Sequence, residues 1–407
     1  MRRAQTNGQS AGPAHVATCA PGYEPVVALA QRAFRWGRGG SLCIVHRGET
    51  VVDTWGGWAD KDAGRPWERD TLGVAWSTTK GMASLAVHLL IDRGELSLDQ
   101  PVAAYWPEYA AEGKAATLVR QVLSMEAGLF DVRHLVPDAR SLLDWEEMTT
   151  RLAAARPAHV PGRACGYHAL TYGYLAGELV RRVSGDSLGA FLDREVRRPL
   201  DLDGFFIGTP VDQHARVAPV PQMVDVGPKV VAVARGLNRL TRRRPLRVDL
   251  RALGSAGVPN DFAVANTPEF LSAQIPSANG AFTARSLAAV YADLAAPEDA
   301  PGRLLSPDQV RRMGLEQNSG RDLVLPMQPR WRLGFHQPFP REAMSHRAFG
   351  FYGAFGSGAW ADPSRQLALG FVLAEGRTPI SPVNRIGTET VRLVDRERGG
   401  LSPASTG

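Results

Sequence analysis

The sequence predicts an α+β fold in which both chain ends build one lobe, an antiparallel sheet flanked by helices, and an all-helical lobe is inserted between them. Turn-bounded segments rich in Val, Ile, Leu and Trp occur near both ends of the chain. The middle of the chain instead shows mainly the apolar spacing of helices. Residues 82–91 are apolar almost throughout, which predicts a helix buried on all sides.

Composition suggests the domain boundaries. Residues 1–20, rich in Ala, Gly, Ser, Thr and Gln, predict a flexible tail. The α/β lobe is expected to combine residues 21–100 with 280–407, and the helical lobe to span 101–279. Within the helical lobe, the Pro-rich and irregular stretch of about 210–275 predicts a lid-like insertion, because long loops of this kind usually carry function.

The elements follow in order from these patterns. Residues 24–36 predict a helix with an apolar stripe, and residues 41–60 predict a β-hairpin that turns at Arg47, Gly48 and Glu49. Apolar spacing predicts further helices over 117–129, 144–155, 171–183, 189–200, 276–295 and 384–398. Alternating or continuous apolar runs predict strands over 331–335, 353–362 and 366–374.

The overall composition is that of a soluble globular protein. Of the 407 residues, 44% are hydrophobic and 22% are charged, which favours an ordinary globular chain. No apolar run is long enough to predict a membrane-spanning helix, so no membrane partner is expected. Arg2 and Arg3 are not followed by the apolar region of a signal peptide, and we therefore expect a cytoplasmic protein.

Charge and metal-ligand patterns exclude several functions. Arg235–Arg251 holds seven arginines against one acid, and its helical spacing up to Pro245 favours a solvated helix face over a rim that attracts an anion. No zinc finger or RNA-binding signature occurs, so no nucleic-acid partner is expected. The cysteines and histidines lack ligand spacing, so we predict no metal and no cofactor.

A possible nucleophile and base stand at the start of the buried helix. Ser77 and Lys80 are three residues apart, which places them on one helix face. A serine hydroxyl becomes a good nucleophile when a neighbour takes its proton, and a lysine can do so once desolvation lowers its pKa. The alternative is that Ser77 caps the helix and Lys80 extends to water. These residues alone do not decide between the two interpretations.

Ser187 and His88 are the other candidates for catalytic roles. Ser187 lies in a G-x-S-x-G match, Gly185 to Gly189, but that motif requires a preceding strand, and here a helix precedes it. We therefore predict that Ser187 caps the following helix. His88 is eleven residues from Ser77, or roughly 16 Å along a helix, and is predicted to face the core or a subunit interface.

Ser77 to Lys80, Tyr167, and the glycine-rich strand from Phe351 to Gly356 are three motifs that occur in this order along the chain. Together they resemble the motifs of the serine β-lactamase and penicillin-binding-protein superfamily. The resemblance is closest to class C β-lactamases and family VIII carboxylesterases and extends from Trp36 to Ala374. It implies a β-lactamase-like fold with the active site in the cleft between the lobes.

The resemblance also implies roles. Ser77 would be the acylated nucleophile, Lys80 its base, and Tyr167 a second proton-transfer group whose phenolate or strong hydrogen bond Lys80 favours. The oxyanion hole would consist of the backbone N–H groups of Ser77 and Ala354.

Departures from the family pattern bear on the substrate. The usual Tyr-x-Asn is replaced by Tyr167, His168 and an alanine, and the usual Lys-Thr-Gly by Phe351, Tyr352 and Gly353. The second change removes the cation that binds an antibiotic's carboxylate. We therefore expect the substrate-binding residues His168, Phe351, Tyr352 and Gly353 to bind a neutral, apolar acyl group rather than a β-lactam.

The predicted function is a cofactor-free serine hydrolase that forms an acyl-enzyme on Ser77 and hydrolyses short or medium acyl esters. The alternative is an acyltransferase that passes the acyl group to an amine or alcohol in a natural-product pathway. A β-lactamase, a D-aminopeptidase or carboxypeptidase, and a non-catalytic binding protein rank below these. The expected partner is a small-molecule acyl substrate, and the sequence leaves the oligomeric state open.

Overall fold

The computed structural model describes residues 13, 15–36, 38–220, 262–318, 320–375 and 381–400. Its main sheet is antiparallel and runs in the order β1-β3-β2-β10-β9-β8, with β4 paired to β3. The strands of this sheet are β1 Val16–Cys19, β2 Gly39–His46, β3 Glu49–Asp60, β4 Arg65–Pro66, β8 Phe349–Tyr352, β9 Gly358–Asp362 and β10 Leu367–Leu373. A smaller sheet runs β5-β7-β6, with β5 Gly73–Val74, β6 Phe205–Phe206 and β7 Ala281–Phe282.

The centre of the main sheet joins the two ends of the chain. β2 pairs with β10 so that Ile44 lies opposite Leu369 and Leu42 opposite Phe371. Every residue of both strands is buried. Such continuous apolar runs occur where both faces of a sheet are covered.

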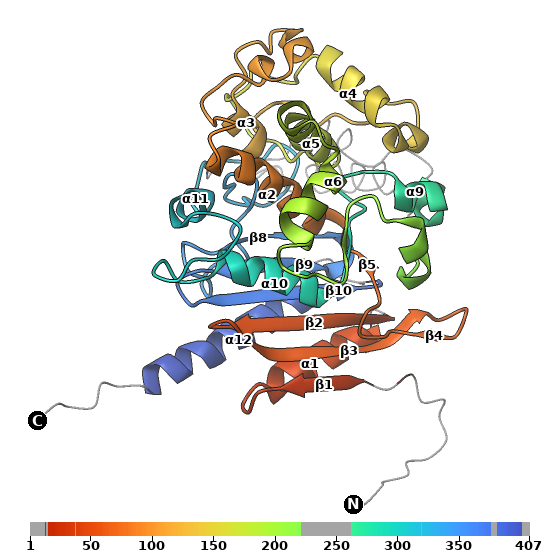
Figure 1. Cartoon of the computed structure of the whole chain (residues 1–407), viewed down its shortest axis with the longest axis vertical. Coiled ribbons are helices and arrows are strands. Elements are labelled where there is room, and N and C mark those ends of the chain that lie inside the picture. Colours follow the sequence, from red (N-terminus) through yellow and green to blue (C-terminus); the bar gives the residue numbers. More distant parts are fainter. Residues whose placement is uncertain are drawn as a thin grey trace, which may run out of the picture.

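Helices provide that cover. α1, Glu24–Trp36, and α12, Ser381–Gly400, lie together on one face, and α10, Ala284–Leu294, lies on the other (Figure 1). The apolar stripe of α1, which includes Val26, Ala30 and Phe34, is buried against the sheet. The predicted bounds of this helix are confirmed.

The remaining helices gather beyond α10, on the side of the sheet away from α1 (Figure 1). Their centre is the contact between α2, Thr79–Asp92, and α5, Thr171–Ser184. The helices that contact this pair are α3 Val119–Leu123, α4 Trp145–Ala154, α6 Leu188–Leu192 and α11 Pro307–Met313, and α9 Pro268–Ser272 is a further short helix of this region.

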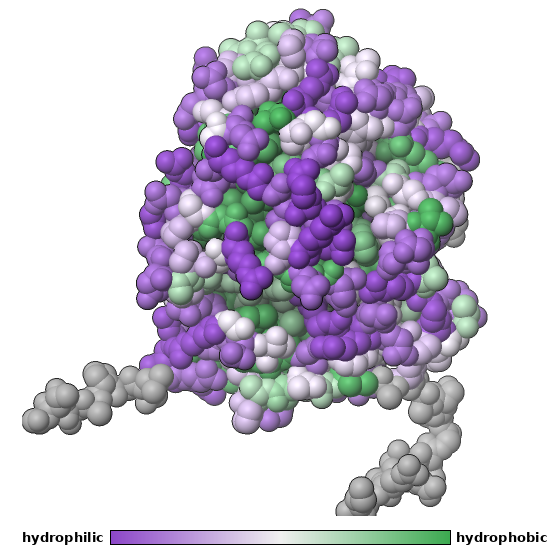
Figure 2. All heavy atoms as spheres, in the orientation of Figure 1, coloured by the Kyte–Doolittle hydropathy of each residue, from purple (hydrophilic) through white to green (hydrophobic). Residues whose placement is uncertain are grey.

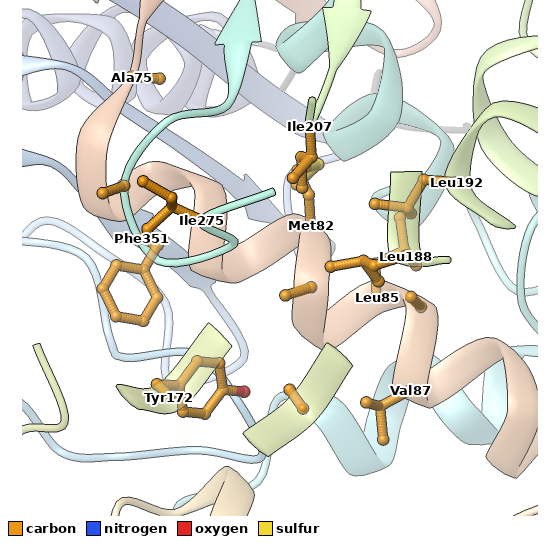
Figure 3. Close-up of a cluster of buried hydrophobic side chains, with 14 of the residues drawn as sticks. Ala75, Met82, Leu85, Val87, Tyr172, Leu188, Leu192, Ile207, Ile275 and Phe351 are labelled. Atoms are coloured by element: carbon orange, nitrogen blue, oxygen red, sulfur yellow. The ribbon is translucent and has the colours of Figure 1, made fainter. Parts of the chain in front are cut away.

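α2 is buried on all sides, as its composition predicts. From Thr79 to Leu90 every residue is buried. Figure 3 shows Met82 directed to Ile207, and Leu85 directed to Leu188 on α6. Burying an apolar side chain of this size contributes roughly 1.5–3 kcal/mol to stability, so this helix is a rigid support for residues at its N-terminus.

The α+β fold with an antiparallel sheet flanked by helices is confirmed, but the predicted strand 331–335 is wrong, and the predicted strand 353–362 begins only at Gly358, after a turn at Ala354–Gly356. Residues 331–335 turn rather than extend, because Gly334 has φ +84° and its N–H donates to Leu123 O. The N–H of Arg332 donates to Phe335 O within the same turn. Trp331 keeps only isolated bridges to Asn318 and His336.

The predicted N-terminal tail also needs correction. Within residues 1–20, Val16–Cys19 forms the edge strand β1, which pairs Val16 with Trp55 and Cys19 with Val52 of β3. The side chain of Thr54 adds a hydrogen bond to Val16 O at 2.7 Å. Composition alone did not reveal this strand, because its stability comes from a hairpin more than thirty residues away. Residues 1–12 and 14 lie outside the described residues.

The central insertion is described only in part. Most of the predicted lid-like stretch 210–275 and the whole basic segment Arg235–Arg251 lie outside the described residues. Between its loops, the described regular secondary structure of 101–279 is helical, except for the short strand β6. This strand, which was not predicted, pairs with β7 next to the start of α10.

None of the described helices combines the length and the apolar composition needed to cross a bilayer. On the face shown in Figure 2, apolar side chains gather only in small, separate patches.

A buried carboxylate ties α4 to α5 and gives a stability prediction. The Glu178 side chain is fully buried and accepts hydrogen bonds from Arg181 at 2.7 Å, Arg182 at 2.7 Å and Trp145 at 2.9 Å. Burial raises the pKa of Glu178, but these donors outweigh burial, and the net pKa is lowered. Glu178→Gln should therefore reduce the free energy of unfolding by about 3 kcal/mol, measured by urea titration at pH 7.

The stability that Glu178 contributes depends on pH, because its pKa is lowered in the folded state. Because the folded-state pKa of Glu178 is below the unfolded value, its contribution is present above about pH 4.5 and is lost as the pH falls through the folded pKa. Glu146→Gln is the matched control, since Glu146 is 72% exposed and pairs with Arg181 at 3.4 Å. It should change stability by less than about 1 kcal/mol. Equal losses in the two variants would contradict the prediction.

Candidate active site

Ser77 lies on a strained turn at the entrance to α2. A single turn of 3-10 helix, Trp76–Thr78, leads directly into α2. Trp76 has φ +51°, and Phe355, on the turn after β8, has φ +62°. Left-handed backbone is unfavourable for bulky side chains and tends to occur where function fixes the geometry. The ring centroids of Trp76 and Phe355 are 5.3 Å apart, so the two strained turns pack against each other.

The hydroxyl of Ser77 is the meeting point of three elements. Lys80, one turn along α2, places its Nζ 3.0 Å from Ser77 Oγ. Tyr167, in the loop before α5, donates its hydroxyl to Ser77 Oγ at 2.7 Å. The structure thus brings together, within hydrogen-bonding distance, the three side chains that the sequence predicts as catalytic.

Lys80 is buried in surroundings that are almost uncharged. Its side chain is fully buried, and Nζ also donates to Ser277 O at 3.0 Å. The Nζ atom lies 5.0 Å from the ring centre of Tyr167 and 5.6 Å from that of Phe351. Among the described residues, no carboxylate pairs with it. Burial therefore holds the pKa of Lys80 well below its ordinary value, which favours the neutral amine.

Tyr167 is held as a neutral phenol. Burial raises its pKa, the hydrogen bond to Ser77 lowers it less, and the charge of Asp322 raises it further. A protonated tyrosine at 2.7 Å from Ser77 Oγ is a hydrogen-bond donor rather than a base. The proton-transfer role expected of Tyr167, as a phenolate or through a strong hydrogen bond favoured by Lys80, stays a prediction.

The strand β8 closes the other side of this cluster. Phe351 is buried, and its ring packs against Tyr167 at 6.4 Å. Gly353 follows, and a Cβ atom there would meet Ala75 O at 2.3 Å, so only glycine allows β8 to approach the Ser77 turn this closely. Ala354 begins the next turn, which contacts Trp76–Thr78. Its role in an oxyanion hole remains a prediction.

His168 does not face the site as expected. Its ring is buried, Nδ1–H donates to Gly166 O at 2.7 Å, and Nε2 accepts from Leu129 N–H at 2.9 Å. Burial lowers the pKa of His168 to about 3, so the ring stays neutral with both nitrogens engaged. A ring held in this way has no polar atom left to bind a substrate, and we reassign His168 as support for the Tyr167 loop.

Tyr352 also requires correction as a substrate-binding residue. Successive strand residues point to opposite faces, so Tyr352 faces away from its neighbour Phe351. It packs in the cluster under α1 and α12, and its hydroxyl donates to Phe339 O at 3.0 Å. Phe351 alone of this pair borders Lys80 and Tyr167.

The two alternative candidates, Ser187 and His88, have structural roles. Ser187 is the N-cap of α6, where its Oγ accepts from Ala190 N–H at 3.3 Å, and the helix α5 precedes it. His88 is buried, with Nε2–H donating to Leu333 O at 2.8 Å and Nδ1 accepting from Gln309. Neither contacts Ser77. Among the described residues, no group of three His, Cys, Asp or Glu side chains is arranged to hold a metal ion.

Sequence reasoning missed three neighbours of the cluster. The carbonyl of Ser277 anchors Lys80, and the indole of Trp331 stacks on the Tyr167 ring at 5.7 Å with an angle of 10° between the planes. The carboxylate of Asp322 accepts the Tyr167 N–H at 3.1 Å. Ser277 acts through its backbone carbonyl, and a backbone acceptor leaves no signal in residue types. Trp331 and Asp322 lie in stretches without a motif.

This fold is that of the serine β-lactamases and penicillin-binding proteins. These proteins also carry a serine and a lysine one turn apart at the N-terminus of a buried helix, as Ser77 and Lys80 are here. The chain belongs to this family, since the family model described as Beta-lactamase matches residues 29–385. The resemblance drawn from the sequence is thereby confirmed.

Particular relatives include esterases. The chain is 35% identical over 378 residues to the esterase/beta-lactamase LipL of Mycobacterium tuberculosis, covering 89% of this chain and 85% of LipL. A crystal structure of a family VIII carboxylesterase aligns with a TM-score of 0.81 and 33% identity, covering 93% of this chain and 100% of that one. A penicillin-binding-protein homologue from Caulobacter crescentus aligns with a TM-score of 0.78 and 34% identity, covering 95% and 100%.

Proposed function

We propose that this protein is a serine esterase that forms an acyl-enzyme on Ser77 and transfers the acyl group of short or medium esters to water. One observation carries the proposal: Ser77 Oγ lies 3.0 Å from Lys80 Nζ and 2.7 Å from Tyr167 Oη. A nucleophile within hydrogen-bonding distance of a base, which is itself oriented by a third group, is the arrangement that nucleophilic catalysis requires. The similarity to a family VIII carboxylesterase and to LipL supports the same class of reaction.

The protonation states suggest a division of labour. Neutral Lys80 accepts the proton of Ser77 as Oγ attacks the acyl carbon, and the backbone N–H groups of Ser77 and Ala354 stabilise the oxyanion. Tyr167 gives its hydroxyl proton to the departing alkoxide and regains a proton from the Lys80 ammonium. Water then attacks the acyl-enzyme, its proton passes to the same groups, and the acid leaves with Ser77 restored. Each proton removed is thus returned within one turnover.

The surroundings of Ser77 favour an uncharged acyl group. The ring centroids of Phe351, Tyr167 and Trp331 lie 5.7–6.4 Å apart, and the rings of Phe351 and Tyr167 border Lys80. Aromatic walls with few polar groups suit neutral, apolar ligands.

Intact-mass spectrometry tests the proposed intermediate. Mixed for milliseconds with p-nitrophenyl butyrate and quenched in acid, the protein should gain one butyryl group, located on Ser77 by peptide mapping. Added alcohols and amines then distinguish the acyl acceptors: free butyrate as the main product supports a hydrolase, and a dominant butyryl ester or amide would favour the acyltransferase alternative. A protein that releases p-nitrophenol without an adduct on Ser77, under conditions that trap acyl-enzymes, would refute the proposal.

Substrate preference gives a further prediction. With Phe351 in place of a cation, a β-lactam carboxylate lacks its charged partner, and the loss of one partner of such a pair typically costs 2–5 kcal/mol. The kcat/KM for p-nitrophenyl butyrate should therefore exceed that for the chromogenic cephalosporin nitrocefin by about 10²-fold or more. Initial rates with both substrates on one protein preparation measure the ratio. A ratio near one would contradict the proposed preference.

A further inference from the structure

Asp322 is a buried carboxylate next to the proposed catalytic cluster. It is 1% exposed, and among the described residues it forms no ion pair. Its Oδ1 accepts the backbone N–H groups of Tyr167 at 3.1 Å, Val324 at 2.8 Å and Leu325 at 2.8 Å. Its Oδ2 accepts the Trp331 Nε1–H at 2.9 Å. A buried charge held only by neutral donors is costly, and such groups gather at functional sites.

The first link from Asp322 to the cluster runs through the backbone. The residues around Asp322 lie beside those around Cys165 in a parallel bridge, with Leu323 N–H donating to Cys165 O at 2.9 Å. Tyr167, just beyond this bridge, has its N–H bound to the Asp322 carboxylate instead of to a carbonyl. The carboxylate thus fixes the main chain of Tyr167, although the two residues are 155 positions apart.

The second link runs through an aromatic ring. Trp331 is buried, and its indole lies nearly parallel to the Tyr167 ring, 5.7 Å away. The orientation of this indole is set by the hydrogen bond from its Nε1–H to Asp322. One side chain therefore constrains both the backbone and the ring plane of Tyr167. The phenol hydroxyl at the end of that ring is the atom that must meet Ser77.

We propose that Asp322 is a positioning residue that, through the Tyr167 backbone and the Trp331 indole, keeps the Tyr167 hydroxyl in hydrogen-bonding distance of Ser77 Oγ. This inference rests on the proposed function of Ser77 and Tyr167. Its chemical importance follows from the steep distance dependence of proton transfer, since a misplacement of about 1 Å can cost roughly 10²-fold in rate. The negative charge of Asp322 also raises the pKa of Tyr167, which favours the protonated phenol that donates to Ser77 Oγ.

Asp322→Asn is the first variant. The amide oxygen can keep the three backbone donors, but the amide N–H₂ then faces the Trp331 Nε1–H, donor against donor. We expect kcat for p-nitrophenyl acetate to fall about 10²-fold with KM nearly unchanged. Asp293→Asn is the matched control, since Asp293 also accepts backbone N–H groups, from Arg303 at 2.7 Å and Leu304 at 3.0 Å, and has no bond to the cluster. It should lower Tm and leave kcat unchanged.

Trp331→Phe supplies the decisive comparison, because it removes the Nε1–H and keeps an aromatic ring. Alone it should lower kcat about tenfold, a typical size for one coupled contact. Combined with Asp322→Asn it should recover about tenfold relative to Asp322→Asn alone, because no donors then oppose each other. A double variant whose loss equals the product of the single losses would overturn the inference. The inference would also be overturned if Asp322→Asn kept the kcat of the wild type, whether or not its Tm fell.

The outcomes separate this inference from the proposed function. If the wild-type protein forms no adduct on Ser77 with a fluorophosphonate probe, the proposed function fails. If it does, and both Asp322→Asn and Trp331→Phe react at the wild-type rate, only the positioning role fails. Should Asp322→Asn not fold, Trp331→Phe alone decides, and an unchanged kcat in that variant overturns the inference.

Discussion

Ser77→Ala should abolish esterase turnover, with kcat falling by about 10⁴-fold or more while the fold is retained. The substitution removes the one oxygen that both Lys80 Nζ and Tyr167 Oη contact, so no acyl-enzyme can form. Ser77 is partly exposed and sits on a turn, so the loss of its hydroxyl should cost little stability. Steady-state rates with p-nitrophenyl butyrate, with Tm measured on the same preparation, check this prediction.

Ser187→Ala is the matched control. It is the same substitution at the other serine that a sequence motif singles out, but Ser187 only caps α6. Loss of an N-cap typically costs about 1 kcal/mol of stability, so Tm should fall slightly and kcat should not change. A dead Ser187→Ala protein beside an active Ser77→Ala protein would return the nucleophile to the G-x-S-x-G motif and reject the assignment made here.

Local patterns predicted the parts of this fold that depend on local physics. The apolar stripe of residues 24–36 and the uniformly apolar stretch after Lys80 each specify a helix and the faces that it buries, and both agree with the structure. β1 was missed because Val16 becomes a strand only by pairing with Trp55. Its own composition resembles that of a tail.

In the active site, too, local sequence patterns predicted the contacts within one element but not those between distant segments. The serine and lysine are one turn apart on one helix, so their contact follows from spacing, but the place of Tyr167 rested on resemblance. The resemblance assigned substrate binding to Phe351 and Tyr352 together. In a strand, however, neighbouring side chains point to opposite faces, so Tyr352 points away from the site that Phe351 borders. The bonds of His168 to Leu129 and of Asp322 to Tyr167 join distant segments, and no residue pattern announces them.

The second large effect concerns the proton path. Lys80→Ala and Tyr167→Phe should each lower kcat by about 10²- to 10⁴-fold, the range for a positioned base or acid. Because the two groups serve one path through Ser77 Oγ, the double variant should lose less than the product of the single losses. A fully multiplicative loss would show that the two side chains act independently. Stopped-flow acylation of the four proteins gives the comparison directly.

The pH profile identifies which of the two groups is the base. Lys80 must be neutral to accept a proton, so kcat/KM should rise with pH and reach a plateau well below pH 10.5, because burial lowers the pKa of this amine. Tyr167, whose pKa burial raises, should add no ionisation below that plateau. Tyr167→Phe should therefore keep the ascending limb at a lower rate, and Lys80→Ala should lose it. If the limb instead disappears in Tyr167→Phe and survives in Lys80→Ala, the phenolate is the base and the roles of the two residues must be exchanged.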